Sequence, residues 1–178
     1  MSCPDHPAPT PKMSSGSSGM LPPDQYLASL ARKRMGAGAL FLDGTGRVLL
    51  VEPTYKPTWE VPGGAVEREE SPTAACRREV LEELGLDRPV GRVLAVDWVP
   101  SRPELPEGLM LIYDGGVLPD EEITRIRLQA DELASYAFVE PHRVPELTSA
   151  LLARRIAACL DALAAGTAAS LENGRPIA

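Results

Sequence analysis

A strongly signalled helix constrains the fold more than any other feature of this sequence. Ser71 is a favourable N-cap residue, and Pro72 occupies the first helical position, where its missing N–H group costs nothing. Gly85 supplies a C-terminal stop. These signals predict a helix over residues 72–84, about three and a half turns long. Its apolar side chains, which predict packing against a core, are Ala75, Val80, Leu81 and Leu84.

The same helix carries three carboxylates on one stripe. Glu79, Glu82 and Glu83 follow the spacing i, i+3, i+4, at which like charges repel one another. Solvent and salt would make an exposed acidic stripe tolerable, and this is the usual explanation of a run of charge. A hard-cation site is the alternative, because clustered carboxylates suit Mg²⁺, Mn²⁺ or Ca²⁺. The helix alone favours the first explanation, and the residues before it change the balance.

Those residues resemble a known family. Gly64 is followed after five residues by Glu70, and after seven more by Arg78-Glu79-Val80-Leu81-Glu82-Glu83-Leu84-Gly85-Leu86. This spacing is similar to the Nudix box, Gly-x5-Glu-x7-Arg-Glu-U-x-Glu-Glu-x-Gly-U, where U is a bulky aliphatic residue, and every fixed position is filled. Such a match arises by chance on the order of one time in ten million or less. The resemblance extends to Trp59, Pro62 and Gly63 just upstream.

The resemblance implies a metal-dependent pyrophosphohydrolase. Its substrate would be a nucleoside diphosphate linked to another moiety, in a nucleotide, a nucleotide-sugar or a dinucleotide, and water would attack phosphorus directly. The implied cofactor is Mg²⁺ or Mn²⁺, which neutralises charge in the transition state and makes a bound water more acidic. A Nudix-fold nucleotide-binding or sensor protein without catalysis is the alternative. The complete set of box glutamates favours the enzyme.

The resemblance also assigns roles to single residues. It makes Glu82 and Glu83 metal ligands, and it gives Glu79 a role as ligand, as general base, or as both. Glu70 is expected to be an outer-sphere or water-mediated ligand. Arg78 is expected to orient the glutamates and to offset part of their repulsion. Without the resemblance, Arg78 would be explained as a surface ion pair of little energetic worth.

Two further parts of the expected metal site lie outside the helix. The backbone at Gly63 and Gly64 has a physical reason to lack a Cβ, because it must turn sharply or approach a metal or phosphate closely. The resemblance suggests the Gly63 carbonyl as a ligand. A downstream acidic residue often completes such sites, and we expect Glu132 to do so in preference to Glu121 or Glu122.

Substrate contacts are less well specified. Trp98 and Arg102 lie in a loop with several prolines, where the indole could stack on a base and the guanidinium could hold a phosphate. A core or interface position is an equal alternative for Trp98. Tyr113 is a third candidate, at a strand end. Short downstream markers of individual substrates in the family do not fit this sequence.

The remaining segments predict an α+β fold. Asp43-Gly44-Thr45-Gly46 between two apolar runs predicts a hairpin. With one helix on each side of the sheet, the order of elements is similar to the Nudix α/β/α sandwich, with a mixed sheet in a single domain. The strands are expected at 36–42, 47–52, 90–99, 109–117, 123–128 and 134–139, and the other helices at 23–34 and 144–165.

Composition sets the boundaries and the partners. Residues 1–24 are rich in Pro, Ser and Gly and are expected to be disordered, the domain is expected at 25–165, and residues 166–178 are expected to form a flexible tail. A formal charge of −7 argues against nucleic acid as the main partner. No segment suits a membrane or a secretory signal.

The expected partner is therefore a small nucleotide-type substrate. Three scattered cysteines, Cys3, Cys76 and Cys159, form no disulfide framework, which favours a cytoplasmic location. The family is often dimeric, so the resemblance leaves a homodimer open.

Overall fold

The computed structural model describes residues 21–177, which fall into two compact units. The first unit extends to Arg32 and contains helix α1 (Pro23–Ser29). The helix expected over 23–34 is shorter than predicted, because Leu30 is extended and Arg34 already belongs to a strand. The second unit starts at Lys33, later than the predicted domain start at residue 25. Residues 1–20 of the predicted disordered segment lie outside the described residues.

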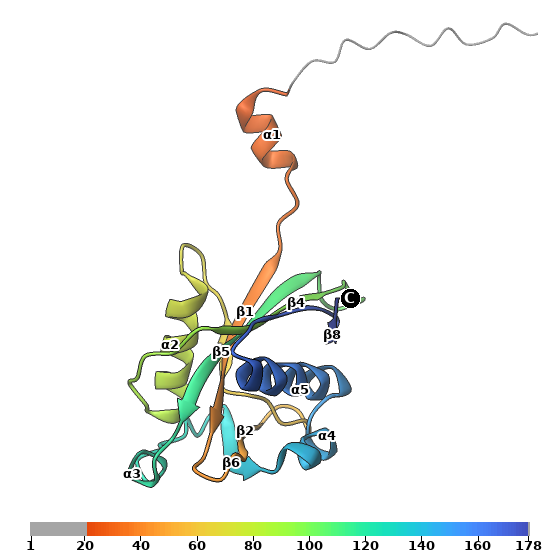
Figure 1. The fold of residues 1–178 in the computed structure, drawn as a ribbon. Coiled ribbons are helices and arrows are strands. Elements are labelled where there is room, and N and C mark those ends of the chain that lie inside the picture. The colour runs from red at the N-terminus through yellow and green to blue at the C-terminus, as the bar shows by residue number, and fades with distance from the viewer. Residues whose placement is uncertain (1–20, 178) are drawn as a thin grey trace, which may run out of the picture. The chain divides into compact units, whose positions relative to one another are not determined.

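The second unit is built on one mixed sheet with helices on both faces (Figure 1). The strands run in the order β6-β2-β1-β5-β4-β7-β8, and β3 also pairs with β1. The β1–β5 and β4–β7 pairs are parallel, and the other pairs are antiparallel. The predicted α/β/α sandwich with a mixed sheet is therefore confirmed. Its strands are β1 (Arg34–Leu42), β2 (Val48–Pro53), β3 (Gly63–Ala65), β4 (Val93–Val99), β5 (Gly108–Val117), β6 (Leu133–Val139), β7 (Ala169–Glu172) and β8 (Arg175–Pro176).

The predicted hairpin between β1 and β2 is confirmed. Its turn is organised by the buried Asp43 carboxylate, which accepts hydrogen bonds from the backbone N–H groups of Thr45 and Arg47. Beyond this turn the two strands separate, and the first half of β1 pairs with β3 instead, so that Gly38 lies opposite Gly63. This exchange of partners brings the glycine turn of the box against the middle of the sheet.

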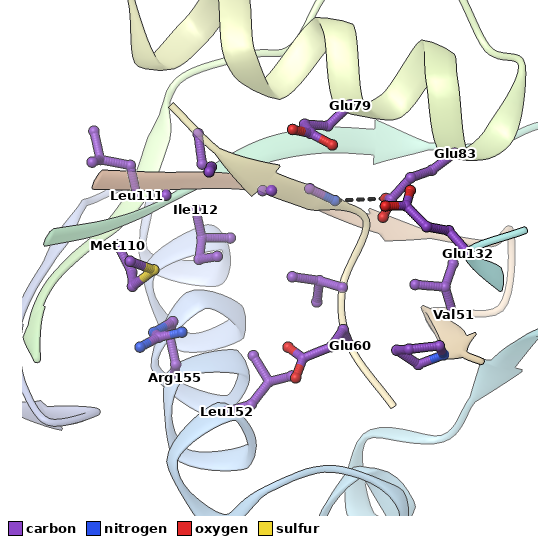
Figure 2. A pocket seen from close by; sticks show the side chains of 18 of the residues that line it. Val51, Glu60, Glu79, Glu83, Met110, Leu111, Ile112, Glu132, Leu152 and Arg155 are labelled. Carbon is purple, nitrogen blue, oxygen red and sulfur yellow. Dashed lines mark hydrogen bonds between the residues drawn. The ribbon is translucent and has the colours of Figure 1, made fainter. Parts of the chain in front are cut away.

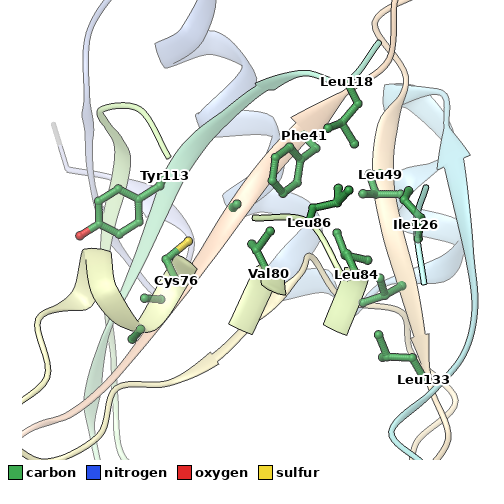
Figure 3. Close-up of a cluster of buried hydrophobic side chains, with 14 residues drawn as sticks. Phe41, Leu49, Cys76, Val80, Leu84, Leu86, Tyr113, Leu118, Ile126 and Leu133 are labelled. Carbon is green, nitrogen blue, oxygen red and sulfur yellow. The ribbon is translucent and has the colours of Figure 1, made fainter. Parts of the chain in front are cut away.

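Helix α2 (Pro72–Leu84) has the predicted limits. The Ser71 hydroxyl accepts a hydrogen bond from the Ala74 N–H, Pro72 stands at the start, and Gly85 closes the helix at φ 69°. Its apolar face packs on a cluster of buried side chains from the sheet, shown in Figure 3. Members of this cluster include Phe41, Leu49, Val80, Leu84, Tyr113 and Leu118.

The helix predicted over 144–165 is broken in two, as α4 (Val144–Leu147) and α5 (Ala150–Ala165). Thr148 is extended, and Ser149 starts a new helix by accepting a hydrogen bond from the Leu152 N–H. The break frees the Leu147 carbonyl to accept from the Trp59 N–H at 3.0 Å, which ties down the loop before β3. Helix α5 covers a second buried cluster on the other face of the sheet (Figure 1).

The strand predicted over 123–128 is wrong. Helix α3 (Asp120–Ile123) ends there, and turns follow, with the Ile126 N–H bonded to the Ile123 carbonyl. Ile126 is buried in the cluster beneath α2, and its apolar neighbours pack against the same cluster without forming strand hydrogen bonds. The Arg127 N–H bonds instead to the Leu84 carbonyl at the end of α2. An apolar run does not by itself distinguish a strand from a packed turn.

The loose tail predicted for 166–178 is corrected as well. Residues 169–172 form β7, which lies parallel to β4 and buries Leu171, and β8 folds back on it. The turn between them is Asn173-Gly174, with φ values of 52° and 74°. This dipeptide is a strong hairpin signal, and it shows that the end of the chain could have been predicted as a strand pair. None of the helices between residues 21 and 177 is long and apolar enough to cross a membrane.

Candidate active site

A cleft of about 610 Å³ opens along β1 and β3 and is lined by residues of α2, α5 and the sheet. Three of the predicted carboxylate ligands line it together: Glu79 and Glu83 from α2, and Glu132, the residue before β6 (Figure 2). Glu132 therefore lies in the same cleft as two box glutamates, and its role as a ligand stays a prediction. A cleft of this size suits a small molecule of nucleotide dimensions.

The glycine turn approaches the helix more closely than any other residue type would allow. Gly63 has φ 143°, and a Cβ there would lie 2.4 Å from the Ala37 carbonyl oxygen. A Cβ on Gly64 would lie 2.4 Å from Oε1 of Glu79. The Gly63 N–H donates a hydrogen bond of 2.8 Å to Oε2 of Glu83. Gly63 therefore holds Glu83 at the cleft by a hydrogen bond, and Gly64 leaves the space that the Glu79 carboxylate occupies.

The Glu83 carboxylate is the most strongly perturbed acid of the site. Its residue is 8% exposed, and burial, followed by neighbouring negative charge, raises its pKa to about 8 against the opposing effect of the Gly63 N–H. The charged neighbours are Glu79, Glu132 and Glu60. Burial also raises the pKa of Glu79, although Arg78 opposes this. The cleft therefore brings together carboxylates whose negative charges are only partly balanced by nearby donors and positive charge.

Arg78 forms hydrogen bonds with the other three carboxylates of the box. Its guanidinium donates to Glu70 through Nε and Nη2, and Nη1 lies 2.8 Å from Glu79 and 3.1 Å from Glu82. A further hydrogen bond reaches the Ala65 carbonyl. Hydrogen bonds from Arg78 are the main reason why the pKa of Glu70 is lowered. The role expected of Arg78 in orienting the glutamates fits these contacts, but Glu82 points to solvent, with its side chain 49% exposed.

These residues fit a divalent cation by the chemistry of their donors. They offer carboxylate oxygens, which Mg²⁺ and Mn²⁺ prefer, next to a glycine backbone that admits close approach. Within residues 21–177, however, no three acidic, histidine or cysteine side chains converge tightly enough to enclose an ion. The physical reason is Arg78, which holds Glu70, Glu79 and Glu82 around its own positive charge.

None of the three predicted substrate residues lines the cleft. Tyr113 is 5% exposed and belongs to the α2 core, where its hydroxyl pairs with that of Thr73 at 3.2 Å. Trp98 is half-buried, and its Nε1–H donates to Glu107. Arg102 is exposed in the loop before β5. The expectation for Tyr113 is therefore corrected, because a strand-end position did not show which face its ring would take.

Several residues of the cleft did not stand out in the sequence. Glu60 lines the cleft and pairs with Lys56 at 2.8 Å, and Tyr55 lies beside Lys56. Arg155 of α5 also lines the cleft. The glutamate directly after Trp59 in the matched Trp-x-x-Pro-Gly stretch was a usable signal for Glu60. Arg155 gave none, because no local pattern distinguishes it from Arg154, the preceding residue of the same helix.

Comparison with known proteins agrees with this geometry. A family model described as "NUDIX domain" matches residues 32–159. The putative 8-oxo-dGTP diphosphatase of Bacillus subtilis (strain 168) is 31% identical over 112 residues, which cover 62% of this chain and 68% of that protein. An RNA pyrophosphohydrolase of Gluconacetobacter diazotrophicus is 31% identical over 86 residues, which are 43% of this chain and half of that protein.

The fold is likewise shared. The crystal structure of the MutT protein from Methanosarcina mazei Go1 superimposes with a TM-score of 0.61 at 20% identity, covering 78% of this chain and 99% of that one. At such low identity the superposition shows the fold alone, whereas the family model covers well over half of the chain. With the complete box and the glutamate-lined cleft, the match establishes that the chain belongs to the Nudix hydrolase family.

Proposed function

We propose that this protein is a divalent-metal-dependent pyrophosphohydrolase that acts on a nucleotide-type small molecule. The observation that carries the proposal is the state of Glu83, a buried carboxylate with three acidic neighbours at the edge of a nucleotide-sized cleft. A cation would relieve this crowding of negative charge. The names of the relatives, a diphosphatase and a pyrophosphohydrolase, give the reaction class that such a site supports.

Glu79, Glu83 and Glu132 would hold the cation, with the Gly63 carbonyl as a proposed backbone ligand. Glu82 and Glu70 would contribute once their contacts with Arg78 loosen. When bound, Mg²⁺ or Mn²⁺ would neutralise charge on the pyrophosphate and lower the pKa of a bound water. Four carboxylates of the box are present for this purpose.

The chain itself supplies positioning and proton transfer. Arg78 keeps Glu79 in place through the 2.8 Å contact between Nη1 and Oε1. Because burial raises the pKa of Glu79, its carboxylate is a better proton acceptor than an exposed glutamate, which suits a general base for the attacking water. The Gly63 N–H holds Glu83 at the cleft. Water would then attack phosphorus directly.

We also propose a cofactor, a class of partner and a cellular location. Mg²⁺ or Mn²⁺ is the proposed cofactor, and no nucleic acid or membrane is needed for a cleft of this kind. Cys76 and Cys159 are free buried thiols, which support a cytoplasmic location. A homodimer stays a prediction.

The test is a substrate panel with Mg²⁺, with Mn²⁺ and with EDTA. It contains ADP-ribose, a nucleotide-sugar, a dinucleoside polyphosphate, a deoxynucleoside triphosphate including 8-oxo-dGTP, and a capped RNA. Metal-dependent release of phosphate or nucleotide from one class would support the proposal and name the substrate. Stabilisation of the fold by a nucleotide without turnover would instead favour the sensor alternative.

A further inference from the structure

The cleft has a second end, away from the box carboxylates, where arginines gather. Side chains alternate along β1, so Arg34, Gly36, Gly38 and Leu40 share one face. Gly36 and Gly38 line the cleft between the two ends. Gly38 lies opposite Gly63, the residue that holds Glu83. Arg34 lies four residues away along the strand, about 13 Å at the usual rise of a strand. Figure 2 shows Arg155 on the side of the cleft away from Glu83 and Glu132.

Arg34 is held in place by groups that leave its charge free. Its Nε–H donates to the Pro106 carbonyl at 2.7 Å. Its stem crosses Gly108, where a Cβ would lie 2.5 Å from Cγ of Arg34, so only glycine admits this path. Among residues 21–177, neither terminal nitrogen of Arg34 has a hydrogen-bond partner, and no carboxylate lies within 4.0 Å of the guanidinium. The half-buried Arg34 side chain lines the cleft, and the N–H groups of its two terminal nitrogens are available to a ligand.

Arg155 adds a second, more deeply buried donor. It is 7% exposed, and its Nε and Nη2 both donate to Oδ2 of Asp97. The described residues supply no acceptor for Nη1, although Arg155 lines the cleft. The other carboxylate near this end, Glu107, is already paired with Lys33 and Trp98. Positive charge at this end is therefore not fully compensated.

The arginines also crowd one another. Burial, followed by repulsion from Arg102 and Arg155, lowers the pKa of Arg34. Arg102 reaches this region from the loop before β5, and Leu105 of the same loop lines the cleft. The two ends of the cleft therefore carry uncompensated charge of opposite sign. A cation would relieve the end at Glu83, and an anion would relieve the end at Arg34.

We infer that the arginine end of the cleft, formed by Arg34 and Arg155, binds a second phosphate group that the substrate carries beyond its scissile pyrophosphate. The inference rests on the proposed function, since that function places the pyrophosphate at the glutamates. Guanidinium groups bind phosphate through two parallel hydrogen bonds, which a carbonyl or hydroxyl cannot match. A chain with net charge −7 needs such local compensation to accept a polyanion.

Two sources of this phosphate have the same chemistry, a 2′-phosphate or a 3′-phosphate on the adenosine ribose. Matched substrate pairs distinguish them. ADP-ribose 2′-phosphate is compared with ADP-ribose, and coenzyme A with dephospho-coenzyme A, in kcat/KM with Mg²⁺. We expect the phosphorylated member of one pair to be preferred by roughly 10- to 100-fold, the usual effect of hydrogen bonds to a charged group.

Arg34→Gln keeps much of the stem but removes the charge. In this variant the ratio of kcat/KM within the preferred pair should fall to about one, and Arg34→Lys should restore part of it. Arg125→Ala is the matched control, because Arg125 is exposed and lies outside this cleft, and it should leave the ratio unchanged. An unchanged ratio in Arg34→Gln, or equal rates within both pairs in the unmodified protein, would overturn the inference.

Binding measurements separate this inference from the proposed function. If no substrate is hydrolysed, the proposed function fails, and calorimetric titration of the same four compounds still tests the arginine end. Tighter binding of a phosphorylated member that depends on Arg34 would support the inference alone. Equal binding of both members of each pair would overturn it.

Discussion

Two buried carboxylates near the same cleft differ in how their charge is balanced. Asp97 on β4 is fully buried, and its Oδ2 accepts from Nε and Nη2 of Arg155 at 2.9 and 2.7 Å. Its Oδ1 accepts from the Gly174 N–H at 2.9 Å. Glu83 on α2 is 8% exposed but receives one backbone hydrogen bond, from Gly63, and faces other carboxylates. The protein supplies a full set of partners for the first carboxylate and only one hydrogen-bond donor for the second.

The difference separates a structural charge from a functional one. A buried carboxylate that accepts two hydrogen bonds from one arginine and a third from the backbone contributes to a fixed geometry. A buried carboxylate whose pKa is raised to about 8 is unfavourable in its ionised form, and either a proton or a bound cation relieves it. Removing Asp97 should therefore damage the fold, whereas removing Glu83 should damage activity and spare the fold. The following changes test this contrast.

Asp97→Asn should have the largest effect on stability. The amide cannot compensate the charge of Arg155, an α5 residue that is 7% exposed. Breaking one side of a buried ion pair costs about 3–5 kcal/mol. Urea denaturation without metal should show this loss. Glu107→Gln, which breaks the part-exposed contact with Lys33, is the control and should cost less than about 1 kcal/mol. Similar losses of unfolding free energy in both variants would mean that Asp97 is not a structural charge in the sense of this comparison.

Glu83→Gln should reduce kcat by about 100-fold or more at saturating Mg²⁺, since it removes a ligand charge next to the reacting phosphate. The amide oxygen can still accept from the Gly63 N–H, and one like charge is lost. The free energy of unfolding without metal should therefore stay the same or rise. Glu172→Gln on β7 is an exposed control with no expected effect. An unfolded Glu83→Gln protein would contradict the assignment of Glu83 as a functional charge.

The pH dependence of stability should carry the same signature. The pKa of Glu83 is about 8 in the folded protein and near 4.5 when unfolded, so the folded state binds the proton more tightly. The stability that Glu83 contributes to the metal-free protein is therefore greatest below pH 4.5 and is lost as pH rises toward 8, by on the order of 4 kcal/mol. Thermal unfolding from pH 5 to 8 should show this slope, and Mg²⁺ should stabilise most at the high end. Glu83→Gln with an unchanged slope would assign the effect to another group.

Sequence alone predicted the parts of the molecule that local signals specify. Helix α2 has its predicted limits because Ser71, Pro72 and Gly85 act within one turn of its ends. The carboxylates that line the cleft were found for a similar reason, since residues 79 and 83 are one turn apart on that helix. Glu132 lies far along the chain and came from the resemblance, so it did not follow from spacing.

The missed features depend on long-range contacts. Arg155 meets Asp97 across 58 residues, and the Gly174 N–H meets it across 77. No local pattern shows that an arginine of α5 points to a buried aspartate. Likewise, the face of β5 that Tyr113 takes was fixed only when β1, β4 and α2 were packed around it. Tertiary context decided these positions, and propensity did not.

Gly174→Ala should produce the smallest of these effects and tests whether the β7–β8 turn supports the Asp97 site. Gly174 has φ 74°, and a Cβ there would lie 2.9 Å from the Leu151 carbonyl oxygen. Gly46 has φ 85° with nothing within 4 Å of the added atom, so Gly46→Ala measures the backbone cost alone, about 1–2 kcal/mol. Because the clash also disturbs the hydrogen bond to Asp97, Gly174→Ala should lose about 1 kcal/mol more than Gly46→Ala in urea denaturation. Equal losses would mean that Arg155 holds Asp97 without help from the turn, and the contrast with Glu83 would then rest on the ion pair alone.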